Sequence, residues 1–481
     1  MSRLRAVLLV CGVCAAVPAS GASPDPKSLS VPAEELSKAR ELVRRLGNEN
    51  YRDREDASAE LAKMGRLARQ ALIEGATTET DPEIRARSAR LLPKADADDL
   101  KARIDTFLED KDAKFDHDLP GLKSFRKSVG GTPKARELYV EMLKSPYTLD
   151  MLAAMDRGHV EGGRAVSDRR NTLYGDMIQR QFVGGRAPTP MKQPTLPEIA
   201  AVLFAESEIP FEFIPRTTIQ WQQVSGVLLF QQSASMNAIN NTGAPHAEAY
   251  RVIVGRWLGT RSDPQDLAQL VYQLGNGNLK QFPETMPLLR RIVVHDTVVG
   301  YAKGQALNFL VQQRGKDEAA FLKALVKGEV RVGDYPELFK KGEDPEKKVS
   351  VGSDAMVTQV WFQRNPNGGV AEMHSVTMRD VAFAFIITQA GLNMRDYGFE
   401  TQPQQNFNPT PQNFGQYAFT TEEKRHAAFV KYGFHQMKQA LKDPADKTPA
   451  KESGPPIPGS GPTKKSDGPQ PVPVPPRIIN K

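Results

Sequence analysis

The sequence has only two cysteines, Cys11 and Cys14, and both lie at its N-terminal end. If the segment that carries them is removed, the remaining chain has no thiol, so it can form neither a disulfide nor a cysteine-ligated metal site. Histidine is also scarce: the chain has seven, and no two stand four residues apart, as a helical HExxH zinc site requires. The sequence therefore gives no reason to expect a metal or another cofactor.

Long uncharged hydrophobic runs are lacking too. The run Ala6–Val17 is shorter than the roughly 20 residues that span a bilayer. Arg3 and Arg5 precede this run and the small residues Ala19–Ala22 follow it, which is the pattern of a secretory signal. We expect residues 1–22 to be a signal peptide, and the mature chain to be periplasmic or extracellular with no transmembrane segment.

The local signatures of common enzymes are missing. The chain has no P-loop, no GxGxxG motif after a strand and no GxSxG nucleophile elbow. A site assembled from distant residues stays open, with His295 and Asp296 as a candidate acid–base pair. We therefore favour a protein without catalytic activity and keep an unrecognised extracytoplasmic hydrolase as an alternative.

Charge of one sign does not dominate either. The formal net charge is +7, and it falls to +5 if Arg3 and Arg5 leave with the signal peptide. Lys and Arg alternate with Asp and Glu instead of gathering in one basic stretch, so specific nucleic-acid binding is not expected. Weak polyanion binding stays a second alternative.

Apolar residues at helical spacing are what the chain does contain, most clearly from Ala39 to Pro93. Spacings of three and four place side chains on one face of an α-helix. Gly47 and Gly65 follow two such runs, where a left-handed C-cap suits glycine, and Asp81-Pro82-Glu83 is typical of a helix start. We expect Pro93 to end that third helix. The apolar stripes are Leu42, Val43 and Leu46, and then Ala57, Leu61, Met64, Ala68 and Leu72.

Part of this pattern recurs. Arg54–Leu61 aligns with Arg85–Leu92 at an offset of 31 residues, and Met378-Arg379-Asp380 begins a third similar stretch. These motifs resemble the second helix of HEAT repeats. The chain as a whole is similar to secreted bacterial HEAT-repeat proteins of unassigned function. The resemblance implies an all-α fold, an α-solenoid-like array of helical hairpins, and no particular activity; an ordinary helical bundle is the alternative.

Composition divides the rest of the chain. Residues 443–481 are rich in proline and glycine, as disordered tails are. The expected parts are a signal peptide (1–22), a flexible lead (23–35), HEAT-like repeats (36–95), a helical continuation (96–156), an Arg/Gly/Pro-rich loop (157–194), a helical region (195–441) with a HEAT-like unit near 375–391, and a disordered Pro-rich tail (442–481).

The candidate contact surface is the concave face of the helical array or the loop from Arg157 to Pro197. We predict that Arg157, Arg164, Arg169 and Arg170 contribute to binding, with a protein or an envelope polymer as the partner. A long solvated connection without function is the plainer interpretation of the same stretch. The sequence does not indicate the oligomeric state.

Amide side chains are unusually frequent in two places. Gln and Asn surround an apolar centre between Thr217 and Asn241, and they alternate with aromatic residues between Gly398 and Thr421. Aromatic residues along a polar stretch can bind sugars or bases by stacking. For residues 398–421 we favour the more common role, in which the aromatic side chains pin an irregular segment against helices.

Overall fold

The computed structural model describes residues 25–178, 193–219, 222–275, 278–339, 342–363, 371–401 and 408–442. The chain divides into one unit of residues 1–420 and a second of residues 421–481. Described residues of the second unit form the helix α18 (Glu422–Lys442). The predicted signal peptide (1–22) and residues 443–481 of the predicted tail lie outside the described residues.

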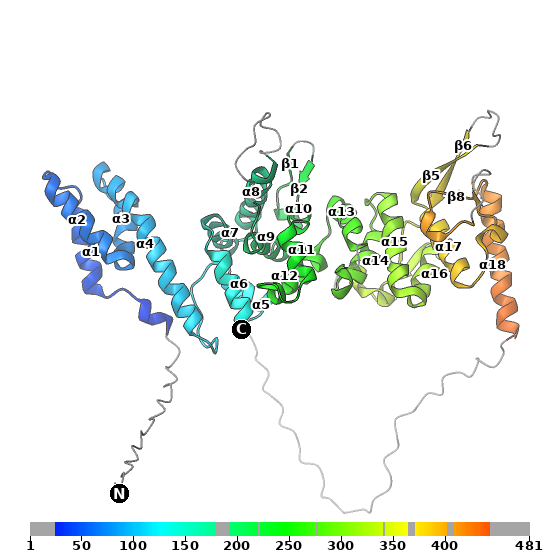
Figure 1. Ribbon diagram of the computed structural model, residues 1–481, viewed down its shortest axis with the longest axis horizontal. Helices are drawn as coiled ribbons and strands as arrows, with labels where there is room; N and C mark the ends of the chain where they lie inside the picture. The colour runs from blue at the N-terminus through cyan, green and yellow to red at the C-terminus, as the bar shows by residue number, and fades with distance from the viewer. Residues whose placement is uncertain are drawn as a thin grey trace, which may run out of the picture. The chain divides into compact units, whose positions relative to one another are not determined.

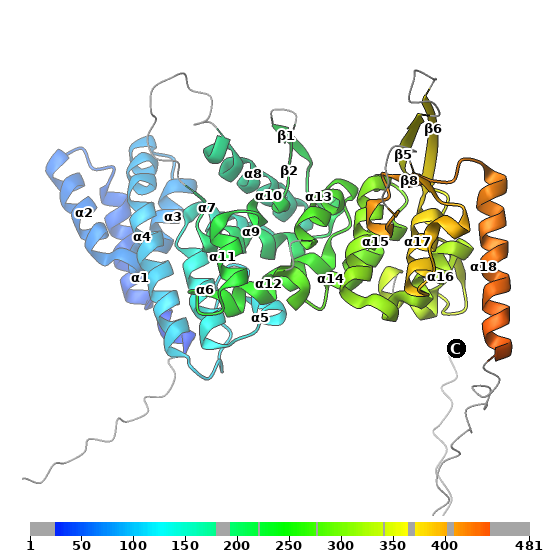
Figure 2. The same cartoon turned by 45° about the vertical axis from the view of Figure 1, so that its right-hand side comes forward.

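The first unit is mostly helical, as the spacing of apolar residues predicts (Figures 1 and 2). Its α-helices are α1 (Ala33–Arg45), α2 (Tyr51–Met64), α3 (Arg69–Thr77), α4 (Pro82–Glu109), α5 (Leu122–Ser128), α6 (Pro133–Leu143), α7 (Pro146–Asp156), α8 (His159–Ile178), α9 (Leu196–Glu208), α10 (Gly226–Phe230), α11 (Ser233–Asn240), α12 (Ala247–Thr260), α13 (Pro264–Leu274), α14 (Thr285–Val294), α15 (Gly300–Arg314), α16 (Ala319–Lys327) and α17 (Met378–Gln389).

Strands are short and pair two by two. Across the described ranges they form four antiparallel pairs, and no sheet there exceeds two strands. The pairs are β1 (Thr217–Ile219) with β2 (Gln222–Val224), β3 (Glu329–Arg331) with β4 (Lys348–Ser350), β5 (Met356–Gln363) with β6 (Ala371–Thr377), and β7 (Glu400–Thr401) with β8 (Tyr417–Ala418). Both ribbon views show the β5–β6 pair extending away from the neighbouring helices.

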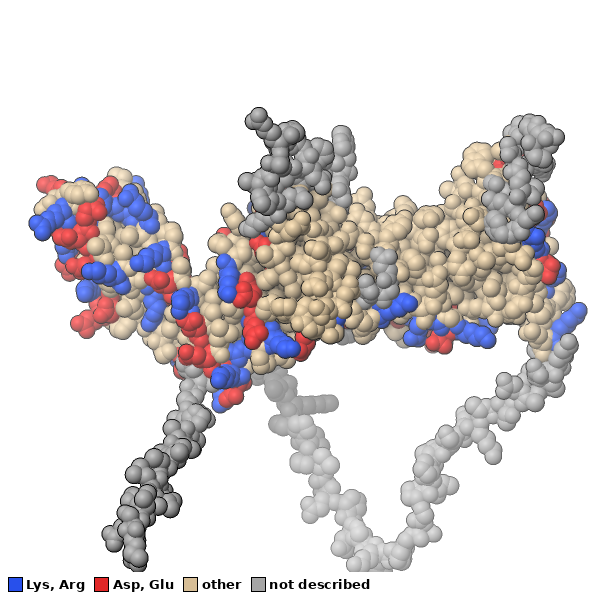
Figure 3. Space-filling view, viewed as in Figure 1, with Lys and Arg blue, Asp and Glu red and all other residues tan. Residues whose placement is uncertain are grey.

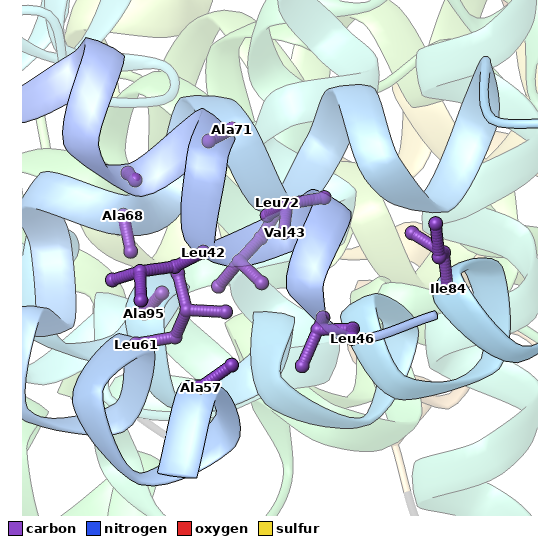
Figure 4. Close-up of a cluster of buried hydrophobic side chains, with 11 residues drawn as sticks. Leu42, Val43, Leu46, Ala57, Leu61, Ala68, Ala71, Leu72, Ile84 and Ala95 are labelled. Carbon is purple, nitrogen blue, oxygen red and sulfur yellow. The ribbon is translucent and has the colours of Figure 1, made fainter. Parts of the chain in front are cut away.

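Helices α1–α4 enclose the first hydrophobic cluster, which Figure 4 shows. The predicted stripes face inward, with Met64 partly buried at the edge. Burial of such side chains is the main stabilising contribution of this region. We call this set the N-terminal cluster: Ala39, Leu42, Val43, Leu46, Ala57, Leu61, Ala68, Ala71, Leu72, Ile84 and Ala95.

The predicted 31-residue offset has a structural counterpart in α2 and α4. Asn50 caps α2 and Asp81 caps α4, each accepting a hydrogen bond from the backbone N–H two residues on. Arg54 donates to the carbonyls of residues 48 and 49, and Arg85 donates to those of residues 79 and 80. Ala57 and Ser88, also 31 residues apart, are both buried.

A second recurrent pattern is a glycine turn between helices, which occurs at Gly65 and again at Gly315. Gly65 ends α2 with φ 53° and ψ −122°, and Gly315 ends α15 with φ 55° and ψ −124°. Each glycine begins a four-residue 3-10 helix, Gly65–Ala68 or Gly315–Glu318, and each is followed by a nine-residue helix, α3 or α16. Residues with a Cβ rarely adopt this backbone conformation, which explains the glycine in both places.

The expectation that a helix ends at Pro93 is wrong. The helix that begins at Pro82 does not end at Pro93 but continues to Glu109. A proline inside a helix removes one backbone hydrogen bond. Beyond Pro93, α4 reaches the next part of the unit, where the ring of Phe107 meets that of Tyr139 on α6 and Arg136 donates to the Phe107 carbonyl.

Helix α9 lies at the centre of the following part. Every residue from Glu198 to Ser207 is buried, and α9 packs against α6, α7, α8, α10, α11 and α12. A helix with apolar residues on all sides is expected in such a position. Helix α17 is similar, since every residue of Met378–Ile387 except Arg379 is buried, and the helix packs against α15 and α16.

Two further expectations need correction. Residues 157–194 are not one loop, because α8 occupies His159–Ile178. Its paired glycines Gly162 and Gly163 are helical, and a Cβ on Gly163 would lie 2.0 Å from the carbonyl oxygen of Phe213. Gly162 and Gly163 therefore allow close packing of α8 and do not indicate a loop. The stretch near 375–391 does form a helix, but Arg379 donates to Asp354 and does not repeat the contacts of Arg54 and Arg85.

Candidate functional site

The predicted arginines lie along the end of α7 and on α8, where they separate into two groups. Arg157 follows α7, and Arg164 is exposed on α8. Arg169 and Arg170 are 6% and 5% exposed, so the expectation that both act as exposed contacts is wrong. Consecutive helical residues point about 100° apart, and these two side chains form ion pairs with different acids of α9.

Three of the four arginines line one recess of about 470 Å³. Arg157, Arg164 and Arg169 share its wall with Tyr147, whose side chain is 67% exposed. A second recess of about 720 Å³ adjoins it and shares Tyr147, Arg169 and Thr172. We call the pair of hollows the α7–α8 recess. Its second half is bordered by the first turns of α7 and α9, at Ser145–Tyr147 and Thr195–Glu198.

Arg169 joins the two halves of the α7–α8 recess. Its Nη2 lies 2.7 Å from Oε1 of Glu198, and its guanidinium lies 5.4 Å from the centre of the Tyr147 ring. The other carboxylate oxygen of Glu198 accepts hydrogen bonds from the backbone N–H and the hydroxyl of Thr195. Thr195 and Glu198 thus form a capping box at the start of α9, and Glu198 also fixes the guanidinium of Arg169 beside Tyr147.

Arg170 points the other way, into the core. It lies 2.9 Å from Oε1 of Glu206, while Arg261 and the indole N–H of Trp257 lie 3.0 and 2.7 Å from Oε2. Burial alone would raise the pKa of Glu206, but the charges of Arg170 and Arg261 outweigh burial and lower it. Gly226 leaves room for this carboxylate, because a Cβ there would lie 2.2 Å from Glu206 Oε2.

A second acid completes the buried group. Asp266 on α13 lies 3.8 Å from Arg261. Burial, reinforced by the nearby charge of Glu206, raises the pKa of Asp266 to about 6. All four charged residues of this group are at most 5% exposed, so we interpret them as part of the core and not as a contact surface. They are Arg170, Glu206, Arg261 and Asp266.

Charge in the α7–α8 recess is mixed. Asp150, Glu161 and Asp168 line it together with the arginines, and Arg157 Nε lies 2.5 Å from Glu161 Oε2. Among the described residues, Arg164 forms no ion pair. This balance of signs does not favour a polyanion, for which a surface of one sign is expected.

The residues of the hydrolase alternative lie elsewhere. His295 follows α14, and its Nδ1 accepts a hydrogen bond from the backbone N–H of Thr297 at 3.3 Å. Asp296 is exposed beside it. Neither side chain lines the α7–α8 recess, so no observation connects them with a substrate site.

In the described part of the chain, no three His, Cys, Asp or Glu side chains gather in a way that could hold a metal ion. None of the described helices is both long and apolar enough to cross a membrane. Comparison of the chain with protein-family models, curated proteins and solved structures finds no match.

Sequence reasoning missed the partners of the arginines. Nothing in the sequence marks Tyr147 or Glu198 as a partner of an arginine, since Tyr147 looks like an ordinary helix residue and Glu198 like a helix cap. Glu206 is marked by its position, because it is an acid at the end of the apolar run Ile199–Ala205, where an unpaired charge would be costly. Such a residue predicts a buried cation, and the adjacent pair Arg169-Arg170 is a source of one.

Proposed function

We propose that the protein is a helical scaffold that binds a protein or an envelope polymer through the α7–α8 recess. The observation that carries this proposal is the gathering of Arg157, Arg164 and Arg169 around one hollow beside an exposed tyrosine. Tyrosine and arginine are enriched among residues that dominate binding energy. Arg169 is buried and held by Glu198 at the base of the recess, whereas Arg157 and Arg164 supply accessible charge.

We further propose that the scaffold is HEAT-like. The matched caps and arginine contacts of α2 and α4 support this assignment, as does the repeated helix, glycine and 3-10 unit at Gly65 and Gly315. In repeat proteins each unit contacts mainly its neighbours, and stacking creates an extended binding surface. A solenoid arrangement is therefore part of the proposal.

Export is also proposed, on the basis of Arg3, Arg5, the apolar run and the small residues that follow it. Protein from its native source should begin near Ala22 or Ser23. N-terminal sequencing tests this, and soluble cytoplasmic protein that retains Met1 would contradict it.

The binding proposal is tested with Arg157→Glu and Arg164→Glu together. Arg169 and Arg170 stay unchanged, because breaking their buried ion pairs would destabilise the fold by about 3–5 kcal/mol and confuse loss of binding with loss of structure. The matched control is Arg44→Glu with Arg52→Glu, which makes the same change of charge on exposed arginines of α1 and α2. The immobilised full chain is incubated with an envelope extract of its native source at low and high salt.

The recess variant should capture less of a partner that the unaltered protein retains, and the difference should shrink as salt rises. The control variant should capture as much as the unaltered protein. Equal loss in both variants would mean that general charge is responsible, and no loss in either would show that the recess is not the contact surface.

A further inference from the structure

Helix α18 of the second unit carries a row of exposed apolar side chains. Val430, Phe434 and Met437 are 44%, 57% and 54% exposed, and their spacings of four and three place them on one side of the helix. Ala428, on the opposite side, is 3% exposed, so the buried face of α18 is a different one. We call Val430, Phe434 and Met437 the α18 stripe. An exposed apolar row of this kind, rimmed by polar residues, is typical of an interaction site.

The charge of α18 is almost entirely positive. From Lys424 to Lys442 the sequence has four lysines and one arginine, and neither Asp nor Glu. The acids Glu422 and Glu423 are confined to the first turn, where they suit the positive end of the helix dipole. By contrast, both signs of charge cover α1–α4 (Figure 3).

The lysines border one edge of the α18 stripe. Lys424, Lys431 and Lys438 are exposed and stand seven residues apart, so they form a row along the helix. Lys431 follows Val430 and Lys438 follows Met437, so each lysine lies about 100° around the helix from the stripe. A lysine stem can lie along an apolar surface while its amine stays in a polar layer.

We propose that α18 binds an anionic lipid surface. The α18 stripe enters the boundary between headgroups and acyl chains, and the lysine row lies against the lipid phosphates. Helices that lie in the plane of a membrane combine an apolar face with lysine and arginine beside it, and anionic lipids attract these cations. Both the stripe and the charge of α18 are then used by one partner.

A second copy of α18 fits these observations less well. The stripe has the spacing of a coiled-coil seam, but coiled coils set acids opposite lysines at the edges of that seam. Since no acid follows Glu423 in α18, two copies would leave their lysine rows without acidic partners.

Interfaces with other proteins are also a poorer match. Lysine is depleted in such interfaces, whereas helices on membrane surfaces are rich in it. The lysine row beside the α18 stripe therefore favours lipid over protein.

The test is flotation of the full chain with vesicles of phosphatidylcholine, alone or mixed with phosphatidylglycerol, at low and high salt. We expect binding to the phosphatidylglycerol vesicles that weakens as salt rises. Phe434→Ala with Met437→Ala should lower the affinity about tenfold or more, because apolar area is lost while alanine preserves the helix. Lys431→Gln with Lys438→Gln should lower it about tenfold or more on the anionic vesicles alone.

Matched controls make the same changes on α1 and α2. They are Tyr51→Ala, at a side chain that is 64% exposed, and Lys38→Gln with Lys63→Gln, at exposed lysines. Both should bind vesicles as the unaltered protein does, and circular dichroism should show that all variants are folded. Every variant keeps residues 1–22, so any contribution of the apolar run in that segment is common to all.

Tryptophan fluorescence locates the contact on the chain. Phe434→Trp and, as its control, Tyr51→Trp are mixed with phosphatidylglycerol vesicles whose brominated acyl chains quench tryptophan inside the bilayer. Relative to the unaltered protein, Phe434→Trp should be quenched more and Tyr51→Trp should not.

Four results would overturn the proposal. The unaltered protein does not float with phosphatidylglycerol vesicles, both α18 double variants float normally, or Phe434→Trp is quenched no more than Tyr51→Trp. In the fourth, sedimentation shows that Phe434→Ala with Met437→Ala changes the oligomeric state while vesicle binding is intact, which indicates a protein interface.

Discussion

At the scale of single residues, the buried group around Glu206 determines how α8, α9 and α12 fit together. Glu206→Gln would leave the guanidinium groups of Arg170 and Arg261 without their ionised partner in a place that solvent does not reach. We expect a loss of about 3–5 kcal/mol in the free energy of unfolding, as for other broken buried ion pairs. Urea denaturation at neutral pH measures this loss. Glu161→Gln, which breaks an exposed pair, should hardly change stability.

Asp266 predicts a dependence on pH. Its pKa of about 6 lies above the ordinary 3.8, so folding takes up a proton between these values. The corresponding stabilisation is fully present below the unfolded pKa and is lost as pH rises through about 6. Asp266→Asn should therefore be more stable than the unaltered protein at pH 7, by about 3 kcal/mol, and the gain should shrink toward pH 4. Urea denaturation across this pH range tests the prediction, and a gain that does not vary with pH would contradict it.

Residue roles were the least predictable part of the molecule. The sequence draws attention to all four arginines equally, but only the three-dimensional fold decides that Arg164 is exposed while Arg169 and Arg170 are buried. The difference follows from their angular positions on α8 and from their partner acids on α9, which are 29 and 36 residues away in the sequence. Spacing within one segment does not contain this information.

At the scale of elements, Gly315 isolates the cost of an unusual backbone conformation. Gly315→Ala places no Cβ within 4 Å of another group, yet its φ of 55° disfavours every residue with a side chain. We expect a loss of about 1–3 kcal/mol from this strain alone. Gly65→Ala should lose a similar amount, because the only atoms near its Cβ belong to the Asp98 side chain, whose carboxylate can move aside. Thermal or urea unfolding measures both.

Gly131→Ala is the control for this pair. Gly131 also has open space around it, but its φ is not positive. The variant should therefore unfold like the unaltered protein. If Gly315→Ala were equally neutral, the repeated glycine would not be required for the turn between α15 and α16.

Helix boundaries were predictable where local chemistry determines them. Asp81-Pro82 does begin α4, and Thr195 with Glu198 does cap α9, because these interactions involve only adjacent residues. Pro93 was misread, since α4 continues through it to Glu109 although a proline removes one backbone hydrogen bond. Likewise, the glycines of α8 read as a loop until their packing partners are known.

At the scale of the whole unit, the helical class and the inward faces of α1–α4 were predictable, because both follow from repeated local spacing. The ion pairs that join α8 to α9 and α12 were not, since they depend on contacts between distant segments.

Stability should differ between regions of the unit. The N-terminal cluster consists of Ala, Leu, Val and Ile and has no aromatic residue. Helix α9 is instead enclosed by six helices, with Phe125, Phe204 and Trp257 among the largest buried side chains near it. Burial of larger apolar surfaces makes local opening more costly.

We therefore expect the backbone amides of α9 to exchange with deuterium more slowly than those of α1–α3, by roughly a factor of ten or more, or about 1.4 kcal/mol. Helix α17, in which all residues of Asp380–Ile387 are buried, should behave like α9. Hydrogen exchange followed by mass spectrometry on the full chain measures these rates. Equal protection of α1–α3 and α9 would mean that the unit opens only as a whole, so that the N-terminal cluster is as strongly coupled to its neighbours as α9 is to its own.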